Sequence, residues 1–132
     1  MKKLLTALSV CLLSACSNAV STEPLDDRVY LLQNAMNDAE ISIGFTPAES
    51  RFAGKAAVNR YFGSYKADGG KLRLENAGAT MMMGPQPLMQ AEREFLQTLD
   101  KVVAFDRRGD TLTLTTSDGK KLVFKRGEEK GE

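Results

Sequence analysis

Short runs in which apolar and polar residues alternate fill most of the chain between positions 29 and 126. Period-two alternation places successive side chains on opposite faces and is typical of a β-strand with one buried face. In the clearest run, 39–45, we expect Ile41, Ile43 and Phe45 to be buried and the intervening residues, including Ser42, to face water. The pattern predicts strands at 29–32, 39–45, 51–58, 61–66, 71–75, 103–105, 111–115 and 122–124.

Turn residues separate the later runs. Asp68-Gly69-Gly70 lies between 61–66 and 71–75, which predicts a β-hairpin. Two further turn signals, at 107–110 and 117–119, predict that the last three strands form a meander.

One segment changes to a helical period of apolar residues. Its apolar positions are Leu88, Ala91, Phe95, Leu99 and Val102. We expect a helix near residues 87–99, with Glu92, Arg93 and Gln97 on its solvent side.

These elements predict a mainly β fold with one helix. The chain has 132 residues, of which 42% are apolar and 27% charged, as expected of one globular domain. A sheet with one apolar face must close or fold over to bury that face and remove its edges. We therefore expect a small antiparallel β-barrel or strongly curved sheet of about seven or eight strands, with the helix at 87–99 covering it.

The first fifteen residues form a targeting segment. A basic MKK start precedes an apolar run that is too short to span a bilayer. The sequence Leu13-Ser14-Ala15-Cys16 then resembles a bacterial lipobox; the alternative is an ordinary secretory signal followed by a chance cysteine. The lipobox predicts removal of residues 1–15 and lipidation of Cys16, with residues 16–26 as a flexible tether and 127–132 as a disordered tail. Ser17 in place of Asp resembles outer-membrane sorting, facing the periplasm.

Charge and residue types narrow the chemistry. The net charge is +1, so we expect no nucleic-acid partner. The chain has no His, the commonest general base and metal ligand. The run Met81–Met83 offers thioethers, but adjacent strand residues point to opposite faces, so we expect these residues to fill the core and to bind no metal. We expect no cofactor.

The polar pair Asn59-Arg60 is the most distinctive candidate site. In a structural role, Asn59 would satisfy backbone groups where strand pairing is interrupted, and Arg60 would pair with a carboxylate such as Glu92. A catalytic role would need a neighbouring base or nucleophile. The aromatic residues Tyr61, Phe62 and Tyr65 form either a binding surface or the wall and rim of the barrel.

Two motifs in order resemble a known family. VNRYFGSY at 58–65 and TMMMGP at 80–85, followed by a helix carrying Glu92, resemble the META domain of HslJ-like heat-shock proteins, here over residues 27–126. Two cysteines of the family pattern are replaced by Val58 and Gly84, and its arginine by Met81. The resulting candidate binding or structural motif is Asn59, Arg60, Tyr61, Gly63, Thr80 and Glu92.

The resemblance implies a bacterial envelope lipoprotein. We expect a non-enzymatic, monomeric protein, held to the membrane through Cys16, that binds an envelope protein or supports outer-membrane integrity and stress tolerance. Two alternatives are a carrier of a small apolar ligand and an inhibitor of a lytic enzyme such as lysozyme.

Overall fold

The computed structural model describes residues 22–129, so Cys16, the predicted signal peptide and residues 130–132 lie outside the described residues. The described chain contains eight strands and one α-helix, with two short 3-10 helices at Met36–Asp38 and Pro47–Glu49. The longer elements are β1 (Val29–Leu32), β2 (Ser42–Thr46), β3 (Arg51–Ala56), β4 (Asn59–Asp68), β5 (Lys71–Ala79), α1 (Gln86–Leu99), β6 (Val102–Arg108), β7 (Thr111–Thr116) and β8 (Lys121–Arg126).

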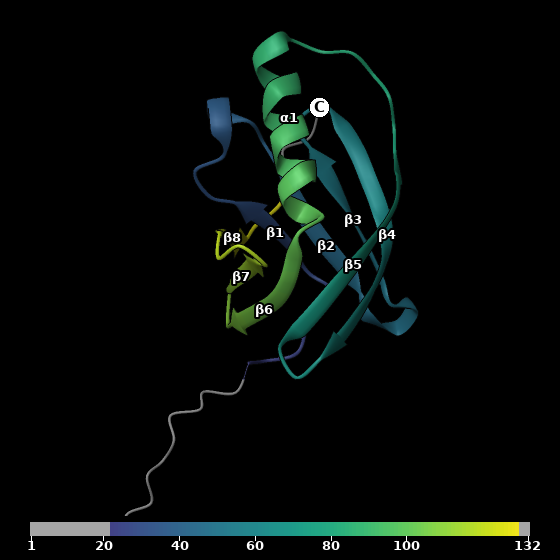
Figure 1. Ribbon diagram of the computed structural model, residues 1–132, viewed down its shortest axis with the longest axis vertical. Helices are drawn as coiled ribbons and strands as arrows, with labels where there is room; N and C mark the ends of the chain where they lie inside the picture. Colours follow the sequence, from purple (N-terminus) through teal and green to yellow (C-terminus); the bar gives the residue numbers. More distant parts are fainter. Residues whose placement is uncertain (1–21, 130–132) are drawn as a thin grey trace, which may run out of the picture.

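The strands form a closed antiparallel barrel. Each strand pairs with the next in the sequence, and β8 pairs with β1 to complete the circle (Figure 1). At the tip of the β4–β5 hairpin, Asp68 lies opposite Lys71, and Gly69 and Gly70 have the positive φ that such a turn requires. The predicted barrel with one helix is confirmed.

The inward-facing residues of the strands fill the barrel. Ile43, Leu112, Leu114 and Phe124 are completely buried. The helix α1 covers one opening, where the ring of Phe95 packs edge-on against Tyr61 and Phe124, at 5.6 and 6.4 Å between ring centroids. Burial of each large apolar side chain contributes about 1.5–3 kcal/mol, so these buried side chains stabilise the fold. In residues 22–129 no helix has the length and apolarity to cross a membrane.

Two residues predicted to face water are buried. Glu92 lies on the inner side of α1, where it meets the β3–β4 turn, and is 7% exposed. Ser42 does point outward from β2, but Glu129 packs over it and accepts a hydrogen bond from its hydroxyl group. Both predictions were wrong because a period-two or helical pattern cannot show which polar residues are covered by distant segments.

The described domain extends past both predicted boundaries. On the N-terminal side, Leu25 is buried, and the Tyr30 hydroxyl donates to Asp26 at 2.8 Å. Burial, reinforced by this hydrogen bond, raises the pKa of Tyr30 to about 12. On the C-terminal side, Gly127 donates its N–H to the carbonyl of Val29. The parts of the predicted tether and tail that are described therefore pack on the barrel.

The segment between β5 and α1 also differs from expectation. Met81, Met82 and Met83 are 91%, 56% and 86% exposed, so the predicted core-filling role was wrong. They belong to an irregular linker at 80–85 that runs outside the barrel to the start of α1 (Figure 1). Because they are not in a strand, the alternation argument does not govern where their side chains point.

Candidate functional site

The candidate site begins at the tight turn between β3 and β4. The chain reverses at Ala57 and Val58, and Ala57 takes a left-handed conformation with φ of 71°. The reversal aims two backbone N–H groups at α1. The Val58 and Asn59 amides both donate to Oε1 of Glu92, at 3.0 and 2.6 Å. A carboxylate on a helix thus accepts from both amides of the turn, and the Val58 amide also donates to the Ala56 carbonyl of β3 at 2.8 Å.

Asn59 occupies the centre of the site and is 3% exposed. Its side-chain amide donates to Oε2 of Glu92 at 2.6 Å and to the carbonyl of Met82 at 3.1 Å. Its side-chain oxygen accepts from the Thr80 hydroxyl at 2.9 Å and from the Met82 amide at 2.6 Å. An asparagine side chain offers two donors and two acceptor positions, and here all four are used. We call Asn59, Thr80, Met82 and Glu92 the Asn59 network.

The Asn59 network joins three segments that are far apart in the sequence. It ties the β3–β4 turn to α1 through Glu92 and to the linker through Thr80 and Met82. The Thr80 hydroxyl also accepts from the Arg60 amide at 3.0 Å, which continues the ladder between β4 and the end of β5. The network therefore fixes the path of the linker and the position of α1. Its polar atoms form hydrogen bonds with one another.

Arg60 points away from this network. Adjacent strand residues face opposite sides, so the inward position of Asn59 places Arg60 on the outer surface. There its guanidinium group binds Glu129 through two nitrogens, at 3.0 and 3.3 Å. Glu129 also accepts from the buried Ser42 hydroxyl at 2.8 Å. The predicted pairing of Arg60 with Glu92 was therefore wrong, and the partner comes from the C-terminal segment.

This contact gives Glu129 a pH-dependent role. The hydrogen bond from Arg60 is the main reason that the pKa of Glu129 lies below its ordinary value of 4.5. A depressed folded-state pKa stabilises the fold above the ordinary pKa, and the contribution is lost as the pH falls through the folded-state value. We expect Glu129→Gln to lower the free energy of unfolding by about 1 kcal/mol at pH 7, and by less at pH 3.

Urea unfolding at the two pH values measures this difference. Glu128→Gln is the matched control, because Glu128 is the exposed neighbour, and it should show no such pH dependence. An equal deficit for Glu129→Gln at both pH values would contradict the assigned ion pair.

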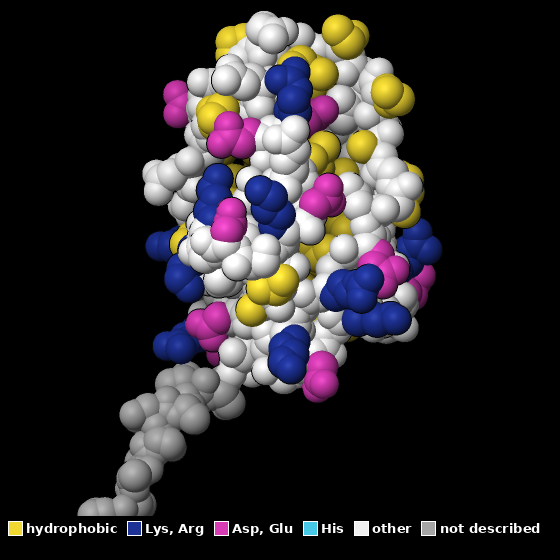
Figure 2. Space-filling view, viewed as in Figure 1, with side chains coloured by type: hydrophobic (Ala, Val, Ile, Leu, Met, Phe, Trp, Pro, Cys, Tyr) yellow, Lys and Arg dark blue, Asp and Glu magenta, His cyan; other side chains and the backbone are white. Residues whose placement is uncertain are grey.

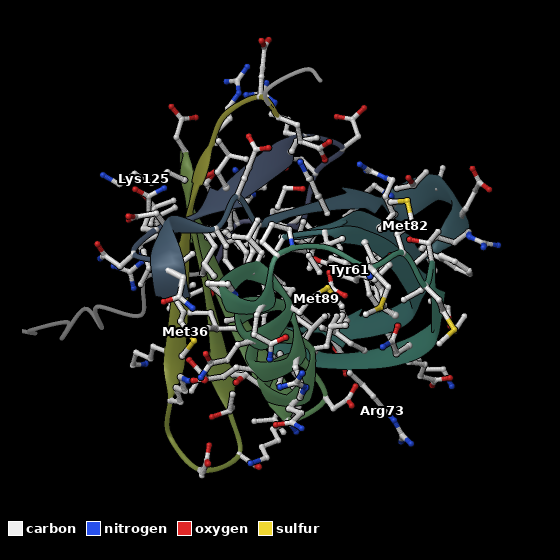
Figure 3. All side chains as sticks on the ribbon, turned by 90° about the horizontal axis from the view of Figure 1, so that it is seen from above. Met36, Tyr61, Arg73, Met82, Met89 and Lys125 are labelled. Atoms are coloured by element: carbon white, nitrogen blue, oxygen red, sulfur yellow. The ribbon has the colours of Figure 1, made fainter. Side chains whose placement is uncertain are left out.

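Tyr61 and Gly63 contribute to the packed wall of the barrel. Tyr61 is 1% exposed, and its hydroxyl donates to the carbonyl of Ser42 at 2.6 Å. Burial raises the pKa of Tyr61 well above its ordinary value. Figure 3 shows Tyr61 directed between the strands and the helix, whereas Met82 lies at the periphery. At Gly63 the β4–β5 register shifts, and the ring of Phe52 lies where a Cβ atom at this position would point.

An exposed apolar surface adjoins the Asn59 network. It consists of Phe62, Met81, Met82 and Met83, and we call it the methionine surface. Phe62 is 41% exposed, whereas its neighbours Tyr61 and Tyr65 are buried in the wall. Figure 2 shows apolar side chains standing along the upper right edge, where Figure 1 places the linker. The backbone of this surface is held at Met82, so its apolar groups are presented from a fixed position.

The structure brings together half of the predicted motif. Asn59, Thr80 and Glu92 meet in one network, whereas Arg60, Tyr61 and Gly63 serve other contacts along β4. Sequence reasoning missed Glu129 and Ser42 as partners, and it missed the backbone of Met82. No local pattern identifies these contacts, since Ser42 and Glu129 lie 87 positions apart.

Comparison with known proteins agrees with this architecture. The model of the META domain family matches residues 24–129. A solved structure of a protein from Burkholderia xenovorans is 25% identical, with a TM-score of 0.63, and the match covers 90% of this chain and 100% of that one. A DUF4847 family protein from Bacteroides vulgatus is 16% identical, with a TM-score of 0.53 over 69% of this chain and 61% of that one, which shows likeness of fold alone. No curated protein matches the chain significantly. With the barrel, its covering helix and the family match in agreement, the chain belongs to the META domain family.

Proposed function

We propose that this chain is a non-enzymatic, lipid-anchored protein of the bacterial outer membrane whose META barrel binds an envelope protein through the methionine surface. The lipobox-like sequence ending at Cys16 supports the anchor and the location. The observation that carries the binding role is the exposure of three consecutive methionines on a linker whose backbone is fixed by Asn59.

Methionine side chains suit this role because they are apolar, flexible and polarizable, and so adapt to the shape of a partner. Exposed apolar groups gathered in one place mark interaction sites more often than scattered ones do. The fixed backbone reduces the entropy that is lost when a partner binds. The Asn59 network thereby acquires a positioning role for the proposed site.

The place of the methionine surface favours a protein partner over the anchoring bilayer. Thr22, the first described residue, lies by the β4–β5 hairpin tip at Gly69 and Gly70. The methionine surface follows the other end of β5, roughly 26 Å away at 3.3 Å per residue. A tether attached at Thr22 therefore leaves the methionine surface at the distal end of the barrel, directed away from the attachment point.

Photo-crosslinking in the native envelope tests the proposal. We expect the full chain with p-benzoylphenylalanine at Met81 to form an adduct with an envelope protein. The matched control carries the same group at Val123, which is exposed on β8, and should not form that adduct. Adducts to lipid alone, or identical adducts from both positions, would contradict the proposal.

Competition with the purified Cys16→Ser chain makes the test specific. This variant cannot be lipidated at position 16, so we expect it to leave the membrane fraction and, when added in excess, to suppress the adduct. The same chain with Met81→Ser and Met83→Ser should compete poorly. Membrane retention of Cys16→Ser would contradict the anchor, and equal competition by both chains would contradict the methionine surface.

A further inference from the structure

The barrel wall is weakest between β5 and β6. The two strands share one paired position, Lys71 opposite Ala104, supported by a hydrogen bond from the Phe105 amide to the Gly70 carbonyl at 2.8 Å. Beyond Lys71, β5 continues for eight residues to Ala79 with β4 on one side and, among the described strands, no partner on the other. An open groove of about 620 Å³ lies along this edge.

The register shows which backbone groups face the groove. Residues of an antiparallel ladder bond alternately to one side and to the other. Lys71 faces Asp68 across a two-residue turn, so Lys71, Arg73 and Glu75 direct their backbone groups at β4. Leu74, which lies between Arg73 and Glu75, and Asn76, which follows Glu75, direct their backbone N–H and C=O groups toward the groove. This arrangement is a template for one more strand.

The side chains around the edge define what such a strand would carry. Leu72 and Leu74 face inward, and Val103 is 47% exposed on the opposite bank of the groove. Figure 2 shows apolar side chains between the positions that Figure 1 gives to α1 and β5. Residues of an added strand that lie opposite Leu74 would therefore meet an apolar floor.

The outer face of the same edge holds two cations directly beside each other. Lys66 on β4 lies directly opposite Arg73 on β5, and like charges in that position repel. Arg73 has an exposed guanidinium group whose ion-pair partner is Glu75, at 3.9 Å. No ion pair within residues 22–129 includes Lys66. A carboxylate on the outer face of an added strand, opposite Arg73, would offset this repulsion.

We propose that the free edge of β5 binds an extended protein segment as an additional strand. The segment places apolar side chains against Leu74 and a carboxylate beside Arg73 and Lys66. Backbone hydrogen bonds to Leu74 and Asn76 supply the binding, and the cation pair selects an acidic residue. This inference goes beyond the proposed methionine surface, since it concerns a different face of the barrel and a different kind of recognition.

The test uses the full chain with Cys16→Ser and the peptide acetyl-Thr-Val-Glu-Val-Thr-amide, whose symmetry fits either strand direction. We expect saturable shifts of the Leu74 and Asn76 amide resonances at peptide concentrations below about 1 mM. The same peptide with Lys in place of Glu should bind about tenfold more weakly. A peptide N-methylated at both valines should not bind, because with Glu opposite Arg73 one of the two valines faces Leu74 in either strand direction.

Two matched variants complete the test. Arg73→Glu should weaken binding of the Glu peptide about tenfold, whereas Lys125→Glu should leave it within about twofold. Figure 3 places Lys125 and Arg73 on opposite sides of the barrel, and both are exposed. Lack of saturable binding, equal binding of the N-methylated peptide, or equal effects of the two variants would overturn the inference. None of these outcomes involves Met81, so they are independent of the crosslinking test of the methionine surface.

Discussion

Replacing Glu92 with alanine should lower the free energy of unfolding by about 3–5 kcal/mol. The carboxylate accepts three hydrogen bonds, from the Val58 amide, the Asn59 amide and the Asn59 side chain. Alanine would leave the Asn59 amide and one side-chain N–H of Asn59 without acceptors where water has little access, whereas the Val58 amide keeps the Ala56 carbonyl at 2.8 Å. Each abandoned buried donor costs about 1–3 kcal/mol. The stability of a whole domain is only about 5–15 kcal/mol, so this one change removes a large share.

Comparison of Glu92→Ala with Glu92→Gln separates the effect of losing the charge from the effect of losing the hydrogen bonds. Glu92→Gln keeps the shape and one oxygen, but its amide group opposes the Asn59 amide, so we expect a loss of about 2 kcal/mol. Glu94→Ala is the matched control on the same helix, because Glu94 is half-exposed and reaches Lys120 only at 3.9 Å. Its effect should stay within about 0.5 kcal/mol.

Urea unfolding measures all three proteins, with the slope of the transition used to check that the folded states are comparable. A double-mutant cycle with Asn59→Ala should show strong coupling, since both residues belong to one network. If Glu92→Ala lowers the free energy of unfolding no more than Glu94→Ala does, Glu92 is not the residue that holds α1 against the β3–β4 turn.

Much of the fold could be predicted from periodicity and turn residues. The β4–β5 hairpin followed from Asp68-Gly69-Gly70, and α1 begins one residue before the expected helix. These features depend on neighbours in the sequence, which is why a pattern reveals them. The incomplete pairing of β5 with β6 depends instead on how the nine-residue β5 lies against the seven-residue β6, and no residue type signals that geometry.

The candidate site was predicted in part, for a related physical reason. Asn59 stood out because a buried asparagine needs partners, and Thr80 and Glu92 entered through the family resemblance. Glu92 was nevertheless placed on the wet face, since a carboxylate in a helix normally faces solvent. Its burial becomes understandable only when the β3–β4 turn presents two amides to it. Glu129 could not be foreseen at all, because its partners Arg60 and Ser42 lie on strands far away in the sequence.

Gly63→Ala should also destabilise the barrel strongly, by about 3 kcal/mol. A Cβ atom at this position would lie 2.2 Å from the carbonyl oxygen of Glu75 and 2.8 Å from the ring of Phe52. The first contact is with backbone on the neighbouring strand, which cannot rotate away as a side chain can. Either the β4–β5 bulge or the position of Phe52 must change, and Phe52 is 2% exposed in the core.

Gly44→Ala provides the matched comparison. Gly44 lies in β2, and its added Cβ would come no closer than 3.5 Å to Val29, an ordinary van der Waals contact. Because alanine also restricts the unfolded chain more than glycine does, Gly44→Ala should be neutral or slightly stabilising. Urea unfolding of both variants, with equal slopes, gives the contrast. Equal stabilities for the two proteins would show that the wall at Gly63 relaxes freely, and that Gly63 does not set the close approach of β4 to β5 and Phe52.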